Sequence, residues 1–169
     1  AFARIAKGFG CKVIAYDKFL TEAPEHIQLV SINEVFSASD VISVHCPLTP
    51  ETQHLFNKDT FDKMKTGVML INTSRGAVIC TQDAIEALKT GKIGYLGIDV
   101  YEQEEKLFFR DLSESVIQDD MILRLLSFPN VLITSHQGFF THEALTEIAH
   151  VTLSNLADEK AGKVSVNRV

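Results

Sequence analysis

Short apolar runs alternate with amphipathic or polar segments along most of the chain. Each run has the length of a buried strand and ends in residues that favour turns, and most runs are followed by a stretch with helical spacing. The runs lie at 12–17, 40–45, 68–71, 97–101 and 130–134. Because strands and helices alternate, the pattern predicts an α/β fold with a doubly wound parallel sheet.

The segments between the apolar runs predict the helices. One face of a helix at residues 1–10 is made of Phe2, Ile5, Ala6 and Phe9. Elsewhere a capping residue such as Ser31, Asn57 or Thr141 precedes the amphipathic stretch. Further helices are predicted at 32–38, 58–65, 81–89, 121–126 and 142–160, and a long loop at 107–120.

The run at 68–71 and the polar turn after it hold the residues on which the functional argument depends. The run lacks polar positions, which is typical of a strand buried on both faces. It ends in Asn72-Thr73-Ser74-Arg75-Gly76, and in open α/β sheets ligands bind beyond the carboxyl ends of the strands. The planar guanidinium of Arg75 can hold an anion there with two hydrogen bonds. For Arg75 alone, the alternative interpretation is a solvated arginine that caps a helix.

Two further candidates, Glu104 and His136, follow the strands predicted at 97–101 and 130–134. In a parallel sheet both would face the same crevice as Arg75. Together the three side chains suit the interconversion of a 2-oxo acid and a 2-hydroxy acid. The arginine binds the carboxylate, the histidine moves the hydroxyl proton, and the glutamate fixes the histidine tautomer, while a nicotinamide supplies the hydride. Each residue alone has a plainer interpretation, as a loop histidine or a solvated acid, but three of them at strand ends favour a site.

Asp17 ends the strand predicted at 12–17, and a predicted helix precedes that strand. A helix, a strand and a terminal acid form the second half of a dinucleotide-binding βαβ unit, in which the carboxylate binds the adenosine ribose. The glycine loop of such a unit would lie before Ala1, and the chain begins inside a helix. We therefore expect the sequence to be part of a longer protein. For Asp17 alone, the alternative interpretation is an acid that closes a turn.

Composition narrows the class of protein. The chain has 169 residues, of which 46% are hydrophobic and 22% charged, as is ordinary for a soluble globular domain. Its net charge of -6 does not favour a nucleic acid or an anionic membrane as partner. We recognise no signal peptide and no apolar run near the ~20 residues of a membrane span. Three widely spaced cysteines, Cys11, Cys46 and Cys80, favour reduced thiols and a cytoplasmic location.

Metal and hydrolase chemistry are poorly supported by the sequence. No H-E-x-x-H or C-x-x-C pattern indicates a metal site, so no metal is expected. Ser74 lies in Thr-Ser-Arg-Gly rather than in the G-x-S-x-G turn of serine hydrolases. His45 and His54 are interpreted as structural, and for His45 the reason is that loop-forming residues follow it directly.

Four ordered motifs, CPLTPET, NTSRGA, GIDVYEQE and HQGF, stand at 46–52, 72–77, 97–104 and 136–139. They resemble the D-specific 2-hydroxyacid dehydrogenases, and among these the fermentative D-lactate dehydrogenases of bacteria. The resemblance implies a reversible, NAD-dependent reduction of pyruvate to D-lactate. It also implies that residues 1–135 are the dinucleotide-binding domain without its glycine loop, and that residues 136–169 are the hinge and C-terminal helix of the substrate domain.

The resemblance assigns roles to single residues. Arg75 would bind the substrate carboxylate, Glu104 would pair with His136, and His136 would donate a proton to the keto oxygen. Asp17 would bind the adenosine ribose, and Phe139 would lie beside the substrate methyl group. The other cofactor contacts would be Cys46, Pro47 and Thr52 on the adenosine side, and Thr73, Ser74, Arg75 and Asp99 on the nicotinamide side.

Two features favour lactate within this resemblance. Glu105 stands where many relatives, such as phosphoglycerate dehydrogenases, have a proline, and the long segment 107–120 is similar to that of the lactate enzymes. Another D-2-hydroxyacid dehydrogenase, or a dinucleotide-sensing corepressor on the same fold, is the alternative. The family commonly pairs through its cofactor domain, so a homo-oligomer is expected. Without a glycine loop, the 169 residues alone are expected to be poorly soluble or partly folded, to bind NADH only weakly and not to reduce pyruvate.

Overall fold

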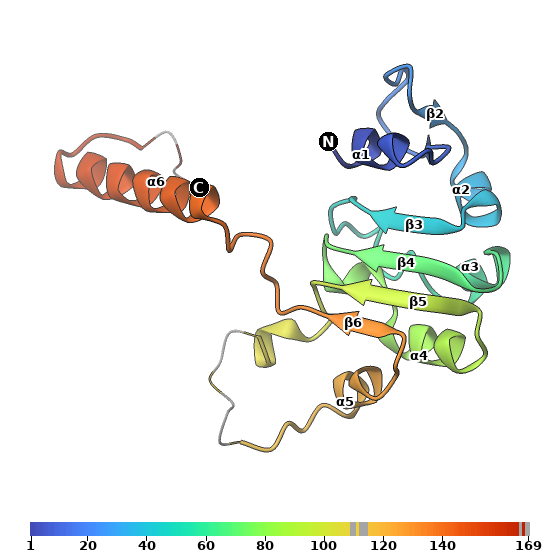
Figure 1. The fold of residues 1–169 in the computed structure, drawn as a ribbon. Helices are drawn as coiled ribbons and strands as arrows, with labels where there is room; N and C mark the ends of the chain where they lie inside the picture. The colour runs from blue at the N-terminus through green and yellow to red at the C-terminus, as the bar shows by residue number, and fades with distance from the viewer. Residues whose placement is uncertain (109–110, 112–114, 166, 168–169) are drawn as a thin grey trace. The chain divides into compact units, whose positions relative to one another are not determined.

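The computed structural model describes residues 1–108, 111, 115–165 and 167 of the chain (Figure 1). The chain divides into two compact units, Ala1–Ser135 and His136–Val169. The first unit holds all the described strands and the shorter helices, and the second holds one long helix. None of the described helices is long and apolar enough to cross a membrane.

A four-stranded parallel sheet forms the centre of the first unit. Its strands stand in the order β3-β4-β5-β6, and each neighbouring pair is parallel. The strands are β3 (Val41–Val44), β4 (Val68–Asn72), β5 (Ile93–Ile98) and β6 (Val131–Ile133). All four arrows point the same way in Figure 1, so the carboxyl ends of the strands share one edge. The predicted α/β class with a parallel sheet is confirmed.

Four helices share one core with this sheet. They are α2 (Ile32–Ala38), α3 (Lys58–Lys63), α4 (Thr81–Lys89) and α5 (Asp120–Leu126). Each contributes an apolar side chain to the buried cluster that contains Val44, Leu70 and Leu96 of the strands. The four predicted helices are therefore confirmed, with ends that differ by a few residues.

The two faces of the sheet are buried to different degrees. Leu70 of β4 is fully buried in the shared core, whereas Met69 and Ile71 are only partly buried and Tyr95 of β5 is exposed. Alternate residues of a strand point to opposite faces, so the shared core lies on the face of Leu70. The prediction that 68–71 is buried on both faces is therefore wrong for the second face.

The N-terminal part of the first unit differs most from the prediction. Helix α1 (Phe2–Gly8) forms, but most of the apolar face predicted for it is exposed. Strand β1 covers only Ile14–Ala15 rather than 12–17. It pairs in parallel with β2 (Gln28–Leu29), which the pattern did not predict, and the two form a separate sheet. The pairing lasts for two residues only, which explains the short strand.

Two short 3₁₀ helices follow the strands that carry the predicted site. They are η1 (Gly76–Val78), after β4, and η2 (Glu104–Lys106), after β5. Strand β5 starts and ends earlier than the run at 97–101. Part of the predicted loop at 107–120, namely 109–110 and 112–114, lies outside the described residues, and the described residues between Phe108 and Asp119 form no helix or strand.

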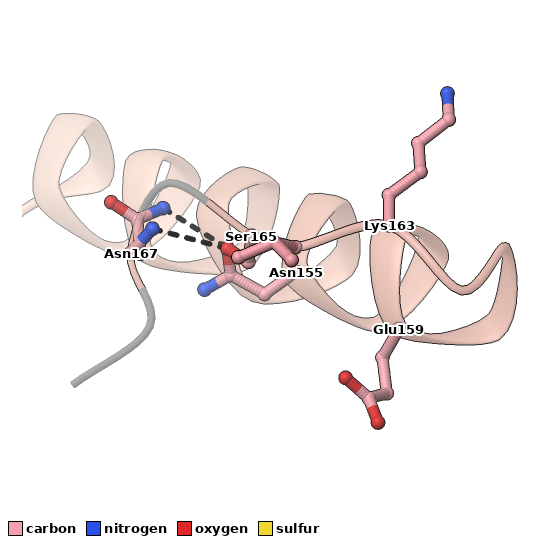
Figure 2. Close-up of a pocket in the computed structure, with 6 residues that line it drawn as sticks. Asn155, Glu159, Lys163, Ser165 and Asn167 are labelled. Atoms are coloured by element: carbon pink, nitrogen blue, oxygen red, sulfur yellow. Dashed lines mark hydrogen bonds between the residues drawn. The ribbon is translucent and has the colours of Figure 1, made fainter.

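The second unit is dominated by α6 (His142–Lys160), which confirms the predicted C-terminal helix. Its N-cap Thr141 accepts a hydrogen bond from the Ala144 N–H at 3.1 Å. Beyond the helix, the chain returns along it and lines a pocket of about 250 Å³ (Figure 2). There Ser165 Oγ and Asn167 Nδ2 donate to Asn155 Oδ1 at 2.8 and 3.0 Å, so the amide oxygen of Asn155 binds both residues.

Candidate active site

The turn after β4 is held by the side chain of the last residue of that strand. Asn72 is buried, its Nδ2 donates to the carbonyl of Arg75 at 2.9 Å, and its Oδ1 accepts from the N–H of Ser74 at 3.0 Å. Leaving such a buried amide unpaired would cost about 1–3 kcal/mol. Asn72 therefore fixes the backbone that carries Arg75. The side chain of Arg75 is exposed, and its Nη1 donates to the carbonyl of Ser74 at 2.8 Å.

Gly76 packs directly against the backbone that follows β5. A Cβ at this position would lie 2.1 Å from the carbonyl carbon and oxygen of Tyr101 and 2.5 Å from the nitrogen of Glu102. Side chains do not approach backbone atoms this closely, so only glycine fits. The contact brings the turn of Arg75 next to the segment that leads to Glu104.

The loop after β3 is closed by its own threonines and joined to the β4 turn. Thr52 Oγ1 donates to the carbonyl of Pro47 at 2.6 Å and accepts from the N–H of Thr49 at 2.8 Å. Ser74 Oγ donates to the carbonyl of Cys46. Burial raises the pKa of the Cys46 thiol, so this cysteine stays protonated at neutral pH. Four predicted cofactor residues thus stand in two loops that contact each other.

Asp99 lies between the ends of β4 and β6. Its N–H donates to the carbonyl of Asn72 at 3.0 Å, and its carboxylate accepts a hydrogen bond from the hydroxyl of Thr134. The N–H of Thr134 in turn donates to the carbonyl of Ile98 at 2.9 Å. The carboxyl edge of the sheet is therefore a continuous row of polar groups from the β4 turn to β6.

The segment after β5 is anchored by a buried tyrosine. The Tyr101 hydroxyl donates to both carboxylate oxygens of Asp119, at 2.9 and 2.8 Å, and Asp119 also caps α5. Burial of the phenol and its bond to this carboxylate raise the pKa of Tyr101 far above its ordinary value. Glu104 turns back toward the same residue, and its Oε2 accepts from the N–H of Tyr101 at 2.9 Å. The predicted catalytic carboxylate is therefore bonded to the backbone of a residue that Asp119 anchors.

Glu102 forms a pair that the sequence did not indicate. Its Oε1 lies 2.7 Å from Nε2 of His54, and its Oε2 accepts from the N–H of Thr81, the first residue of α4, at 3.1 Å. Burial alone would raise the pKa of the Glu102 carboxyl, but the hydrogen bonds from His54 and Thr81 outweigh burial and lower it. The partners stand 48 residues apart in the sequence, so no local motif could reveal the pair.

The lowered pKa of Glu102 predicts a pH-dependent contribution to stability. A carboxyl whose pKa is lower in the folded state stabilises the fold at pH values above its unfolded pKa, ~4.3, and loses this effect as the pH falls through the folded pKa. We expect Glu102→Gln to destabilise the full-length protein by about 1 kcal/mol at pH 7 and by less at pH 3, where more of the carboxyl is protonated. Thermal unfolding across this pH range measures the difference, and Glu105→Gln, at an exposed carboxylate nearby, is the control. A loss that is equal at both pH values would contradict the assignment.

Asp17 lies two residues beyond β1 and closes a turn. Its Oδ1 accepts hydrogen bonds from the N–H groups of Phe19 and Leu20, at 2.7 and 3.0 Å. The carboxylate is exposed, and the turn uses only one of its oxygens. The second oxygen can therefore accept a hydrogen bond from a ribose hydroxyl, so the turn does not conflict with the predicted cofactor contact.

His136 and Phe139 belong to the second unit. His136 adopts a φ of 52°, in the left-handed region that few residues other than glycine enter. Phe139 is exposed and packs edge-on against Phe140, with their ring centroids 6.3 Å apart. The predicted proton donor and the predicted methyl contact thus stand close together in the sequence at the start of this unit.

Most of the predicted site residues therefore gather at the carboxyl edge of the four-stranded sheet. These are Cys46, Pro47, Thr52, Thr73, Ser74, Arg75, Asp99 and Glu104. Asp17 follows the separate two-stranded sheet instead. Across the described part of the chain, no three His, Cys, Asp or Glu side chains are arranged to hold a metal ion.

The fold and this edge define a class of dinucleotide-binding protein, and the chain matches a family of that class. Residues 1–138 match the NAD binding domain of the D-isomer specific 2-hydroxyacid dehydrogenases. The match covers more than half of the chain. The chain therefore belongs to this family, as its four motifs indicated, and the cofactor of the domain is NAD.

Individual relatives are similar over the whole chain. It is 56% identical to the 2-hydroxyacid dehydrogenase homolog of Haemophilus influenzae and 52% identical to the D-lactate dehydrogenase of Escherichia coli K12, each over 171 residues. Each alignment covers 100% of this chain and 52% of the relative. A solved structure reported with the identification of the pyruvate reductase of Chlamydomonas reinhardtii is 43% identical to this chain, with a TM-score of 0.89. The match covers 98% of this chain and 51% of that one. The chain thus spans about half the length of the relatives it matches.

Proposed function

We propose that the full-length protein, meaning this chain with all natural sequence that adjoins it, reduces pyruvate to D-lactate with NADH and catalyses the reverse reaction. Family membership supports the reaction class, and the names of the Escherichia coli and Chlamydomonas relatives favour pyruvate within it. The observation that carries the proposal is the exposed guanidinium of Arg75 on a backbone fixed by the buried Asn72. A 2-oxo acid presents a planar carboxylate, which a guanidinium binds with two parallel hydrogen bonds.

Three residues act on the substrate in this proposal. Arg75 binds the carboxylate and polarises the neighbouring carbonyl, and His136 donates the proton that the keto oxygen acquires. Glu104 keeps the histidine in the tautomer that can donate. The nicotinamide supplies the hydride when it is bound. Phe139 lies beside the substrate methyl group, where an aromatic ring favours a small apolar substituent.

The groups at the carboxyl edge suit a dinucleotide. Thr73 and Arg75 are exposed in the turn after β4, and Asp99 adds a carboxylate at the next strand end. We assign Thr73, Ser74, Arg75 and Asp99 to the nicotinamide side, and Cys46, Pro47 and Thr52 to the adenosine side. Asp17 binds the adenosine ribose through the oxygen that its turn does not use.

Asp17 is expected to set the preference for NADH over NADPH, because its carboxylate repels the 2′-phosphate of NADPH. Asp17→Asn keeps the oxygen that accepts from Phe19 and Leu20 and removes only the charge. Since two unit charges about 4 Å apart in water interact by about 1 kcal/mol, the exchange should improve kcat/KM for NADPH relative to NADH roughly fivefold. Steady-state kinetics with both cofactors measures this, and Asp40→Asn, at another exposed acid, is the control. Equal efficiency of the two cofactors in the unmutated protein would refute the role of Asp17.

A dinucleotide-sensing corepressor on the same fold is the rival function. Such a protein would bind NADH without consuming it. We expect the full-length protein to oxidise NADH only when a 2-oxo acid is added. Among pyruvate, 2-oxobutyrate, hydroxypyruvate and 2-oxoisocaproate, pyruvate should have the highest kcat/KM. If another of these acids has a higher kcat/KM, the assigned product becomes the 2-hydroxy acid formed from that acid instead of lactate.

The remaining assignments follow from the proposed enzyme and stay predictions. Residues 1–135 would be its dinucleotide-binding domain, and residues 136–169 the hinge and the C-terminal helix of its substrate domain. A homo-oligomer and a cytoplasmic location are expected for the full-length protein. Its partners would be small molecules, pyruvate and D-lactate, rather than nucleic acids or membranes.

A further inference from the structure

His54 connects three segments of the first unit through its backbone and its ring. Its N–H donates to the carbonyl of Ala77 at 2.8 Å, and its carbonyl accepts from Nδ2 of Asn57 at 2.9 Å. Its Nε2 lies 2.7 Å from Oε1 of Glu102. Since an ionised carboxylate can only accept hydrogen bonds, Nε2 carries the proton and donates it. One residue thus joins the η1 segment after Arg75 to the segment after β5.

The backbone of His54 is strained, which indicates that these contacts determine its conformation. Its φ is 50°, in the left-handed region, where histidine is less disfavoured than most residues but still uncommon. Such conformations persist only where surrounding contacts hold them, and they cluster at functional sites. The backbone bonds to Ala77 and Asn57 hold the strained residue in place, and its ring is thereby directed at Glu102.

Glu102 stands between Tyr101 and Glu104, the proposed catalytic carboxylate. Tyr101, directly before it, is buried and bound to Asp119, and Glu104, two residues after it, accepts a hydrogen bond from the N–H of Tyr101. Glu102 attaches this short segment to Thr81 of α4 through one oxygen and to His54 through the other. Without the bond to His54, the segment would still be attached to Asp119 and Thr81, but it could shift about these two attachments.

The exposure of the His54–Glu102 pair favours a role in the geometry of the site over a role in the stability of the fold. The side chains of His54 and Glu102 are 39% and 24% exposed. A hydrogen bond between side chains that are this accessible to water contributes about 1 kcal/mol or less to stability. Catalysis is far more sensitive, because a displacement of about 1 Å in a catalytic group can reduce a rate roughly 100-fold.

We propose that His54 is a positioning residue of the reductase, which acts by holding Glu102 and thereby fixing Glu104 against the turn of Arg75. This inference rests on the proposed function. It predicts a specific kinetic pattern. The turn of Arg75 has its own support in Asn72, so pyruvate and NADH should still bind when the ring of His54 is lost. The rate of the proton transfer that depends on Glu104 should fall instead.

The test compares two replacements in the full-length protein. Asparagine tolerates the left-handed conformation but is too short to reach Glu102, whereas glutamine keeps an N–H donor at the reach of Nε2. We expect His54→Asn to lower kcat for pyruvate reduction at least tenfold, with the KM for pyruvate and the Kd of NADH changed less than twofold. His54→Gln should recover kcat to within about threefold. Rates are expressed per NADH-binding site, counted by calorimetry, so that loss of folded protein does not enter.

A second measurement reports on the segment without relying on activity. Hydrogen–deuterium exchange of the full-length protein should become faster in peptides covering 99–104 in His54→Asn, and should be normal there in His54→Gln. Unchanged kcat and unchanged exchange in His54→Asn would overturn the positioning role, as would a glutamine variant as slow as the asparagine variant. If the unmutated protein does not reduce pyruvate, the proposed function fails, and the role in the reaction fails with it. Faster exchange in the asparagine variant would then show only that His54 holds the segment.

Discussion

Replacing Arg75 by lysine is expected to raise the KM of the full-length protein for pyruvate by roughly 100-fold and to lower kcat as well. Lysine keeps the charge but presents a single ammonium group, which cannot form two parallel hydrogen bonds to a carboxylate. The backbone at Arg75 is fixed by Asn72, so the shorter side chain cannot be compensated by a shift of the turn. Steady-state kinetics with pyruvate at saturating NADH measures both constants.

The affinity for NADH shows whether Arg75→Lys impairs substrate binding alone or the protein as a whole. Calorimetry should give nearly the same Kd of NADH for Arg75→Lys and the unmutated protein. Arg4→Lys, at an exposed position of α1, should change neither constant. Equal losses of NADH and pyruvate binding in Arg75→Lys would indicate a role of Arg75 in folding and would contradict the carboxylate contact.

Replacing Gly76 by alanine should have an effect of similar size for a different reason. The added Cβ would lie 2.1 Å from the Tyr101 carbonyl, and the obstacle is backbone rather than a flexible side chain. Either the turn of Arg75 or the segment of Glu104 must move, at a cost of roughly 3 kcal/mol or more. We expect kcat/KM for pyruvate to fall by about two orders of magnitude or more, since displacements of about 1 Å already have this effect.

Gly8 provides a matched control for this exchange. It lies in helix α1, and a Cβ there would meet no atom within 4 Å. Alanine is favoured over glycine in helices, so Gly8→Ala should leave kcat/KM and the melting temperature unchanged or slightly higher. An unaltered melting temperature and kcat/KM in Gly76→Ala would contradict the close packing of the two segments.

The part of the site around β4 could be predicted because its signals are local. An apolar run, a polar turn directly after it and an arginine within that turn are all contained in 68–76. The alternation of strands and helices placed further strand ends at the same edge, and the structure has Asp99 and Glu104 beyond β5. Capping residues such as Asn57 marked helix starts correctly, because a cap bonds to a backbone group three residues away.

Contacts between distant segments could not be predicted in this way. His54 and Glu102 look like an ordinary loop histidine and one acid in an acidic run, and only the folded chain brings them to 2.7 Å. Gly76 likewise reads as a turn glycine, whereas its closest neighbour is the backbone of Tyr101. Both features depend on how two loops pack, which no periodicity within either loop encodes.

Strand boundaries were misjudged where glycine serves packing rather than a turn. Strand β5 begins at Ile93, but Gly94 interrupts its apolar pattern, so the sequence favoured a start at 97. A Cβ on Gly94 would lie 2.5 Å from the carbonyl oxygen of Gly67, which shows that the glycine is required by the close approach of the neighbouring chain. Strand β2 was missed because a strand of two residues has no periodicity to detect.

The most direct test of the central claim is the identity and chirality of the product that the full-length protein forms from pyruvate and NADH. We predict lactate in an amount equal to the NADH consumed, and D-lactate alone when the product is assayed with a chiral column. Arg75→Lys at the same pyruvate concentration should form far less of it. A folded protein that binds NADH but forms no lactate, or one that forms L-lactate, would contradict the assignment.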